Sequence, residues 1–302
     1  MDPAAARDWW LALEPVHAVV YFDEGCRRSM AELGLRGFWM GYFAGRAAPL
    51  GPVAPEVVAA TFFNFAPDMV ARALPDAWAL AEPDRVWAAR RAGAASALRR
   101  IVPDIDERAV RLVPLLTLPV AAASGAGRAL FAATRATGWP DDPVEALWHA
   151  CTCLREHRGD GHVAALTASG LDAVEALVLF GASEGLPDEL FLAARGWSAD
   201  EWADAAGRLR DRGLLDGDGP THQGTQLRRA VEAMTDHQAA LPYASLEDGA
   251  LGDGAFGDGD GAGGAAMARE VLEALAPVTS AVHRSGTIAY PNPMGLPAPT
   301  LP

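Results

Sequence analysis

Ionisable side chains gather in residues 148–169, WHACTCLREHRGDGHVAALTAS, which hold three of the seven histidines and two of the three cysteines. Neighbouring carboxylates and imidazoles shift one another's pKa, and a group that titrates near neutral pH can act as a general acid or base. Four residues of this stretch are therefore predicted as candidate catalytic groups: Glu156, His157, Asp160 and His162.

A purely structural explanation competes with the catalytic one. Gly159 can end a helix in the left-handed conformation. Asp160 can then cap a second helix that starts at Gly161. This explanation accounts for much of the stretch but leaves Glu156 and His162 without a role, so both interpretations stay open.

A metal site in the same stretch is not favoured. His149, Cys153 and His157 recur every four residues along a helix that Asp141 or Asp142 can cap. A straight helix separates the first from the last by about 12 Å, so one metal ion could bind only two of them. We therefore predict no metal site, and the sequence indicates no particular cofactor.

Residues 36–46, RGFWMGYFAGR, are typical of a ligand-binding wall. Glycine costs a helix roughly 0.5–1 kcal/mol relative to alanine, so Gly37, Gly41 and Gly45 indicate a surface that another helix or a flat ligand approaches closely. An arginine at each end could hold an anionic substituent of a ligand. The predicted ligand-binding residues, two of them from outside this helix, are Arg36, Trp39, Tyr42, Phe43, Arg46, Asn64 and Arg158.

The charge of the chain restricts its partners. The net charge is −14, and every basic side chain is an arginine. An acidic surface repels nucleic acid and anionic membranes, which argues against both as main partners. The lack of lysine excludes Schiff-base chemistry, a P-loop lysine and a Ser-Lys dyad. A small molecule is the expected partner.

Cysteine content and hydropathy favour the cytoplasm. Cys26, Cys151 and Cys153 are too few for a disulfide framework. No basic segment followed by an apolar run begins the chain, and no apolar run reaches the roughly 20 residues that span a bilayer. We expect a cytoplasmic protein without a membrane partner.

Composition and periodicity predict a mostly α-helical fold, because alanine and leucine dominate and β-branched residues other than valine are scarce. Residues 9–33 show helical periodicity, with His17 and Tyr21 on one face. Residues 85–102 are a second such segment. A last helix is expected over residues 267–283, broken near Pro277. The arginines predicted to face outward from residues 85–102 are Arg90, Arg91, Arg99 and Arg100.

After Gly170 the expected order is three helices, a hairpin and a fourth helix, which is the order of a winged helix. Ser198 and Glu201 form a capping box at the start of the third helix. The predicted domains are an all-helical domain with a candidate pocket (1–169), a winged-helix-like domain (170–246), a Gly/Asp-rich disordered insertion (247–264), and a C-terminal helix with an extended Pro-rich tail (265–302).

The segment GWSADEWADAAGRLRDRGLLDGDGPTHQGTQLRRAVEAMTD resembles the second half of a MarR-like winged helix. Apart from residues 248–264, the chain is similar to an actinobacterial family that carries such a domain after an all-helical N-terminal region. This resemblance also rests on LEPVHAVVYF, LRGFWMGYFAGRAAPLG, FFNFAPDMVARALP, LREHRGDGHVAAL and PNPMGLP. The family, mostly described as hypothetical or helix-turn-helix, implies a fold and no reaction.

The winged-helix segment is too acidic for a typical DNA-binding surface. Residues 171–242 contain 13 Asp and Glu against 6 Arg, and Asp200, Asp204 and Asp211 lie on the outer face of the third helix. Packing or dimerisation is another use of such a domain, so a second copy of the chain is a candidate partner. Two functions stay open: a small-molecule-binding protein, with or without acid–base catalysis, and a MarR-like regulator that binds a ligand and DNA.

Overall fold

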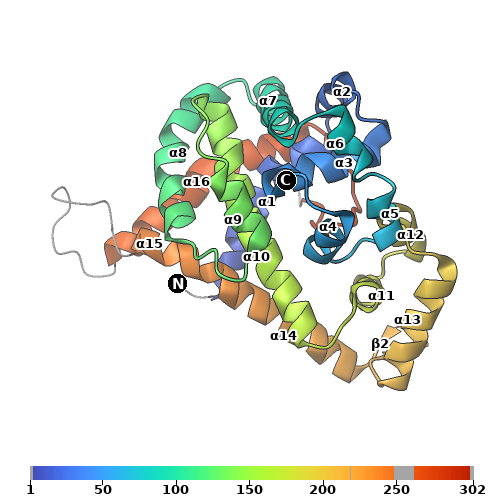
Figure 1. The fold of residues 1–302 in the computed structure, drawn as a ribbon. Helices are drawn as coiled ribbons and strands as arrows, with labels where there is room; N and C mark the ends of the chain where they lie inside the picture. Colours follow the sequence, from blue (N-terminus) through green and yellow to red (C-terminus); the bar gives the residue numbers. More distant parts are fainter. Residues whose placement is uncertain (1–2, 218, 248–261, 300–302) are drawn as a thin grey trace.

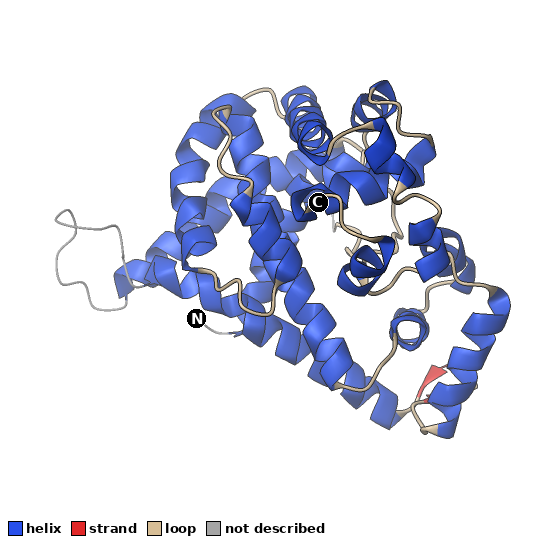
Figure 2. Cartoon of the chain, in the orientation of Figure 1, coloured by secondary structure: helices blue, strands red, loops and turns tan. Residues whose placement is uncertain are grey.

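Helices form nearly all the secondary structure in the computed structural model, which describes residues 3–217, 219–247 and 262–299. Figure 2 shows one short hairpin as the only strands within that described part. The predicted mostly α-helical class is confirmed. Residues 248–261 of the predicted insertion lie outside the described residues.

The first half of the chain supplies nine α-helices and one turn of 3-10 helix (Figure 1). They are α1 (Pro3–Phe22), α2 (Glu24–Glu32), α3 (Gly37–Ala47), the 3-10 turn η1 (Ala48–Leu50), α4 (Pro55–Phe62), α5 (Pro67–Ala71), α6 (Asp76–Leu80), α7 (Pro83–Ile101), α8 (Ile105–Ala122) and α9 (Ala129–Ala136).

The second half begins with the longest helix of the described chain, α10 (Pro143–Ala168). It is followed by α11 (Ala173–Glu184), α12 (Asp188–Arg195), α13 (Ala199–Asp211), β1 (Leu215–Asp216), β2 (Gly219–Pro220), α14 (His222–Ala240), η2 (Leu241–Tyr243), α15 (Ala244–Glu247) and α16 (Ala262–Arg284). The strands pair antiparallel with Leu215 opposite Pro220. Three helices, a hairpin and a helix thus follow one another in the predicted order, and a MarR-like arrangement of them stays a prediction.

Local capping explains where two of these helices begin. Asp142 accepts hydrogen bonds from the backbone N–H groups of Val144 and Glu145, both at 2.9 Å, and so starts α10 as predicted. The predicted capping box of Ser198 and Glu201 is likewise present at the start of α13. Each cap satisfies N–H groups that a helix leaves unpaired in its first turn.

The predicted end of a helix at residues 159–161 is wrong, because α10 continues through both glycines to Ala168. Gly161 makes room for a close neighbour instead. A Cβ atom there would lie 2.6 Å from Nη1 of Arg128. Arg128 uses that nitrogen to donate to the carbonyl of His157. The glycine therefore allows a buried arginine to reach the backbone of α10, which is a packing role rather than a cap.

Two other predictions are wrong: the outward position of Arg90 on α7, and the break of the last helix near Pro277. Arg90, predicted to face outward, is only 3% exposed because α7 is packed by α1, α2, α3 and α10. Arg91 is half-buried, whereas Arg99 and Arg100 are exposed as predicted. α16 runs unbroken through Pro277, with Leu275 and Val278 fully buried on the two sides of that residue.

Two large apolar cores and one small cluster of Ala6, Ala239 and Ala240 stabilise the described part of the chain. The larger core fills the helical body, which we define as α1–α9, the first half of α10, α15 and α16. The smaller core fills the C-terminal unit, defined as α11–α13, the hairpin, the end of α10 and the start of α14. Figure 1 shows α10 and α14 running side by side from the body to this unit, and the two helices pack against each other.

No single helix among residues 3–217, 219–247 and 262–299 is long and apolar enough to cross a membrane. Only α10 and α11 taken together pass that test of length and composition, and they are bent by 99° relative to each other.

Candidate functional site

A cavity of about 430 Å³ lies where the helical body meets the C-terminal unit. Helices α1, α3, α10, α11 and α14 contribute to its wall, and the C-terminal tail crosses it at Pro293, Met294 and Gly295. Arginines outnumber carboxylates in the wall, which contains Arg7, Arg46, Arg155, Arg158, Arg195 and Arg228 together with Glu14, Asp160, Glu184 and Glu232. Glu156 and Asp236, just outside the wall, pair with Arg46, Arg155 and Arg158, so the charges around the cavity largely balance.

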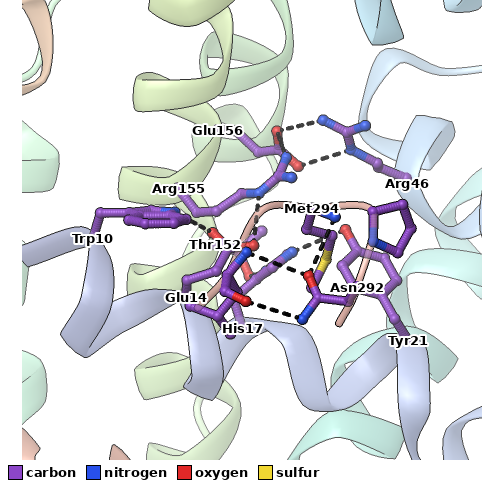
Figure 3. Close-up of polar contacts among 12 residues, drawn as sticks. Trp10, Glu14, His17, Tyr21, Arg46, Thr152, Arg155, Glu156, Asn292 and Met294 are labelled. Atoms are coloured by element: carbon purple, nitrogen blue, oxygen red, sulfur yellow. Dashed lines mark hydrogen bonds and ion pairs between the residues drawn. The ribbon is translucent and has the colours of Figure 1, made fainter. Parts of the chain in front are cut away.

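Glu156 stands at the centre of a buried ionic network beside this cavity (Figure 3). Arg46 donates to its two carboxylate oxygens at 3.1 and 3.0 Å, and Arg155 donates to Oε2 at 2.7 Å. Arg155 also reaches Glu14 at 3.5 Å, which accepts from the indole of Trp10 at 3.2 Å. Burial alone would raise the pKa of Glu156, but Arg155 and Arg46 hold it well below its usual range. This carboxylate joins α3 to α10 and is not available as a base.

His157 points away from the cavity. Its ring packs edge-on against Phe131, with the ring centroids 5.1 Å apart. Burial, and then the nearby Arg128, lower the pKa of His157 to about 3, so the imidazole is neutral at pH 7. It is a buried packing residue on the α9 side of α10.

Asp160 and His162 both line the cavity. Oδ2 of Asp160 accepts from the backbone N–H of Phe131 at 2.9 Å, and burial raises the pKa of Asp160 to about 6. Nδ1 of His162 lies 2.9 Å from Oγ1 of Thr235, whose own proton goes to the carbonyl of Val231 at 2.8 Å. His162 must therefore donate from Nδ1, which leaves Nε2 unprotonated. Burial lowers the pKa of His162 to about 4.

The continuous course of α10 spreads the four predicted catalytic residues around its circumference, since successive residues turn by about 100°. Glu156 faces Arg46 of α3, and His157 faces Phe131 of α9. His162 faces Thr235 of α14. The structure brings Asp160 and His162 to one cavity and places Glu156 and His157 elsewhere.

The predicted ligand-binding residues divide in the same way. Tyr42, Arg46, Asn64 and Arg158 line the cavity, and Oδ1 of Asn64 is buried without a hydrogen-bond partner among the described residues. Arg36 lies apart, exposed and 3.3 Å from Asp76. Two aromatic side chains pack behind the wall: Phe43 is fully buried, and Trp39 is half-buried.

Arg195 is a cavity residue that the sequence analysis missed. It is 8% exposed, its guanidinium lies 4.6 Å from the ring centroid of Phe65, and it donates to the carbonyls of Pro293 and Ala194 at 2.6 and 3.2 Å. No carboxylate among the described residues pairs with it, and burial lowers its pKa to about 10. An arginine before Gly196 has the ordinary sequence signature of a helix C-terminus, so nothing in the sequence marked it.

Tyr21, His17 and Thr152 form a buried chain of hydrogen bonds in the helical body, of which the sequence predicted only the shared helix face of His17 and Tyr21. Oγ1 of Thr152 donates to the carbonyl of Trp148 at 2.8 Å, so His17 must donate to Thr152 from Nδ1 at 2.9 Å. Tyr21 then donates its hydroxyl proton to Nε2 of His17 at 2.9 Å. The four-residue spacing of His17 and Tyr21 was the available signal. Burial lowers the pKa of His17 far below its usual value, which suits a structural role.

His149 and Cys153 meet as their spacing suggested, with Sγ 3.5 Å from Nε2. Burial raises the pKa of the Cys153 thiol and lowers that of His149 to about 4. Within residues 3–217, 219–247 and 262–299 no group of three or more His, Cys, Asp or Glu side chains is arranged to hold a metal ion.

Comparison with known proteins gives one match. A family model described as a helix-turn-helix family matches residues 6–289. No curated protein and no solved structure matches the chain. The match extends from residue 6 of the helical body through the C-terminal unit, and it covers the cavity wall except for the tail residues Pro293, Met294, Gly295 and Pro297. The chain belongs to this helix-turn-helix family.

Proposed function

We propose that the chain binds a small organic anion with an aromatic or otherwise apolar body in the cavity between the helical body and the C-terminal unit. Arg195 carries this proposal. A guanidinium with a pKa of about 10 is charged at pH 7, and a buried charge without a counter-ion is costly. A ligand carboxylate would supply the missing counter-ion. Phe62, Phe65 and Tyr42 would contact the apolar part of the ligand.

The pairing of the other wall arginines singles out Arg195 as the place for a ligand anion. Arg7 and Arg228 both pair with Glu232. Arg46 and Arg155 are neutralised by Glu156, and Arg158 by Asp236 at 2.9 Å. Arg195 is the wall arginine that contacts two carbonyl groups and a ring instead of a carboxylate of the described residues, so a ligand anion would bind most strongly there.

Any acid–base chemistry on the bound molecule falls to His162 and Asp160 in this proposal. The neutral ring of His162 offers an unprotonated Nε2 as a base. Asp160, whose pKa is raised to about 6, can hold or release a proton near neutral pH. Glu156 and His157 have no catalytic part in it.

A calorimetric titration tests the proposal. 2-Naphthoate and 2-naphthamide share an aromatic body and differ in charge. The wild-type protein should bind the carboxylate at least about tenfold more tightly, which is the range expected for a charge-assisted hydrogen bond. Arg195→Gln should remove that preference while the far-ultraviolet circular dichroism stays unchanged. Equal preference in the two proteins would contradict the proposal.

A second candidate is a ligand-responsive regulator that binds DNA, which the helix-turn-helix family match favours. The charges on α13 argue against it. Arg208 pairs with Asp172 at 2.6 Å and with Glu175 at 3.1 Å, and Arg212 pairs with Glu175 at 2.9 Å. These arginines are engaged within the C-terminal unit and are not free for phosphate groups.

An electrophoretic mobility shift separates the two candidates. The full chain is incubated at low salt with the DNA upstream of its own coding region. We expect no shift that weakens steeply with added salt, because the exposed face of α13 carries Asp200, Asp204 and Asp211. A tight, salt-sensitive shift that 2-naphthoate relieves would establish the regulator instead.

A further inference from the structure

A second cavity, of about 320 Å³, lies in the helical body between α1, α2, α3 and α7. Tyr42 of α3 lines both cavities, but the other residues of their walls differ. The wall here is mostly apolar, with Val20, Met30 and Phe38 among its side chains. Among the described residues, no Asp or Glu lines it. The proposed anion binding at Arg195 does not depend on this second cavity.

Arg90 is the buried charge in this second cavity. It is 3% exposed, and its guanidinium carbon lies 5.0 Å from the ring centroid of Tyr21 and 5.7 Å from that of Trp148. Its Nε is buried without a hydrogen-bond partner in the described part of the chain. No residue of the described ranges makes a hydrogen bond or ion pair with Arg90, so the aromatic rings are its only electrostatic support there.

The surrounding side chains leave that charge uncompensated. Asp23, near Cys26 of the cavity wall, pairs with Arg100 at 2.6 Å. Tyr21 pairs through its hydroxyl with His17, and among the described residues its oxygen accepts no hydrogen bond from Arg90. Because a guanidinium stays charged at any ordinary pH, a buried and unpaired one is unfavourable unless an anion joins it.

The shape of the wall indicates where an apolar body would lie. Gly41 faces Met30, and a Cβ atom at Gly41 would lie 3.0 Å from that side chain. Gly45 leaves the space that Nη1 of Arg90 occupies, 3.1 Å from where its own Cβ would be. Two of the three glycines spaced along α3 thus make room for α2 and for Arg90.

We propose that this second cavity binds an aliphatic monocarboxylate, with the carboxylate on Arg90 and the hydrocarbon chain along Met30, Gly41 and Phe38. A single planar guanidinium with free donors matches a carboxylate in a two-point geometry. Arg27 and Arg28 also line the wall but are exposed, so among the wall residues Arg90 is the buried guanidinium that the carboxylate would meet. Arg27, whose guanidinium lies 5.2 Å from the ring centroid of Phe38, is exposed at the rim and favours the approach of anions.

Calorimetric titration with decanoate and decanol tests this assignment, because the two share a hydrocarbon chain and differ in the head group. The full-length wild-type protein should bind decanoate at least about tenfold more tightly than decanol. Arg90→Met should lose that preference while its decanol affinity stays within about twofold of wild type. Arg85→Gln, at an exposed position of the same helix α7 and outside both cavities, is the matched control and should keep the preference.

A second variant, Arg90→Lys, keeps the test informative if Arg90→Met fails to fold. Arg90→Lys keeps the charge and loses the planar fork, so it should weaken decanoate binding by at least about threefold and leave decanol binding unchanged. Several results would overturn the assignment: no decanoate binding by the wild type, an undiminished preference in both Arg90 variants, or a loss of preference in Arg85→Gln.

Discussion

Glu156 and Arg195 show how differently two buried charges can be used. Glu156 is 2% exposed and is neutralised by Arg46 and Arg155, so it serves the fold. Arg195 is nearly as buried but is supported by carbonyl groups and the ring of Phe65. The sequence predicted Glu156 as a catalytic group and did not predict a role for Arg195. Burial and pairing, which a sequence does not display, decide between structural and functional roles.

Replacing Glu156 with glutamine should destabilise the protein strongly. The neutral amide cannot neutralise Arg46 and Arg155, and removing one partner of a buried ionic group costs about 3–5 kcal/mol. We expect urea unfolding of Glu156→Gln to give a free energy of unfolding lower by about 2–4 kcal/mol. Glu189→Gln, at an exposed position of α12, is the control and should change it by less than about 0.5 kcal/mol. Equal effects of the two substitutions would contradict the assigned role.

Helix α10 organises the site because it continues where the sequence suggested a break. Glycine within a helix is unfavourable in isolation, so Gly159 and Gly161 looked like end signals. The reason that the helix continues is a contact distant in sequence: Arg128 packs on the backbone beside Gly161. The sequence signal for Asp142 was reliable because a cap depends on its immediate neighbours. Whether α10 continues past its glycines depends instead on side chains that are distant in sequence.

Alanine substitutions at the two glycines of α10 should act in opposite directions. A Cβ atom at Gly159 would lie 3.5 Å from the nearest atom, an ordinary contact, so Gly159→Ala should stabilise the protein by about 0.5–1 kcal/mol. At Gly161 the Cβ atom would lie 2.6 Å from Arg128, which would have to leave the carbonyl of His157. Gly161→Ala should therefore destabilise by about 1–2 kcal/mol despite the better helix former.

Thermal and urea unfolding of both variants measure this difference. Gly207→Ala, at a helical position with no atom within 4 Å of a new Cβ, provides a further control and should also stabilise. If Gly161→Ala were as stable as Gly159→Ala, the packing role of Gly161 would be wrong.

For the molecule as a whole, the sequence predicted the helical class, the order of the C-terminal elements and two helix caps. It did not predict that Arg90 is buried, because helical periodicity assumes one buried face and α7 is packed on several sides. It also could not show that the C-terminal tail meets α12 through Pro293 and Arg195. That contact joins positions 98 residues apart and leaves no local pattern.

Three buried histidines and the half-buried His162 should make the fold sensitive to acid. Burial lowers the pKa of His149 and His162 to about 4, that of His157 to about 3, and that of His17 well below its usual value. A lowered pKa means that the unfolded chain takes up protons first, so stability is complete above about pH 6.5 and falls as the pH drops toward about 4. Asp160, with its pKa raised to about 6, opposes this in part, because the folded state binds its proton first.

Urea unfolding at pH 7.5 and pH 5.5 should therefore differ by roughly 3–5 kcal/mol, with the lower stability at pH 5.5. His149→Gln should shrink that difference by about 1.4 kcal/mol, since one proton fewer is taken up on unfolding. A difference that is unchanged in His149→Gln would contradict the assignment of His149 as a neutral buried imidazole.

The central claim is that Arg195 pairs with a ligand anion in the cavity between the helical body and the C-terminal unit. The most direct measurement is the calorimetric titration of 2-naphthoate into wild type, Arg195→Gln and Arg36→Gln, since Arg36 is an exposed arginine outside the cavity. We predict that Arg195→Gln weakens binding at least about tenfold and that Arg36→Gln matches the wild type. Equal binding by wild type and Arg195→Gln, or a loss confined to Arg36→Gln, would contradict the claim.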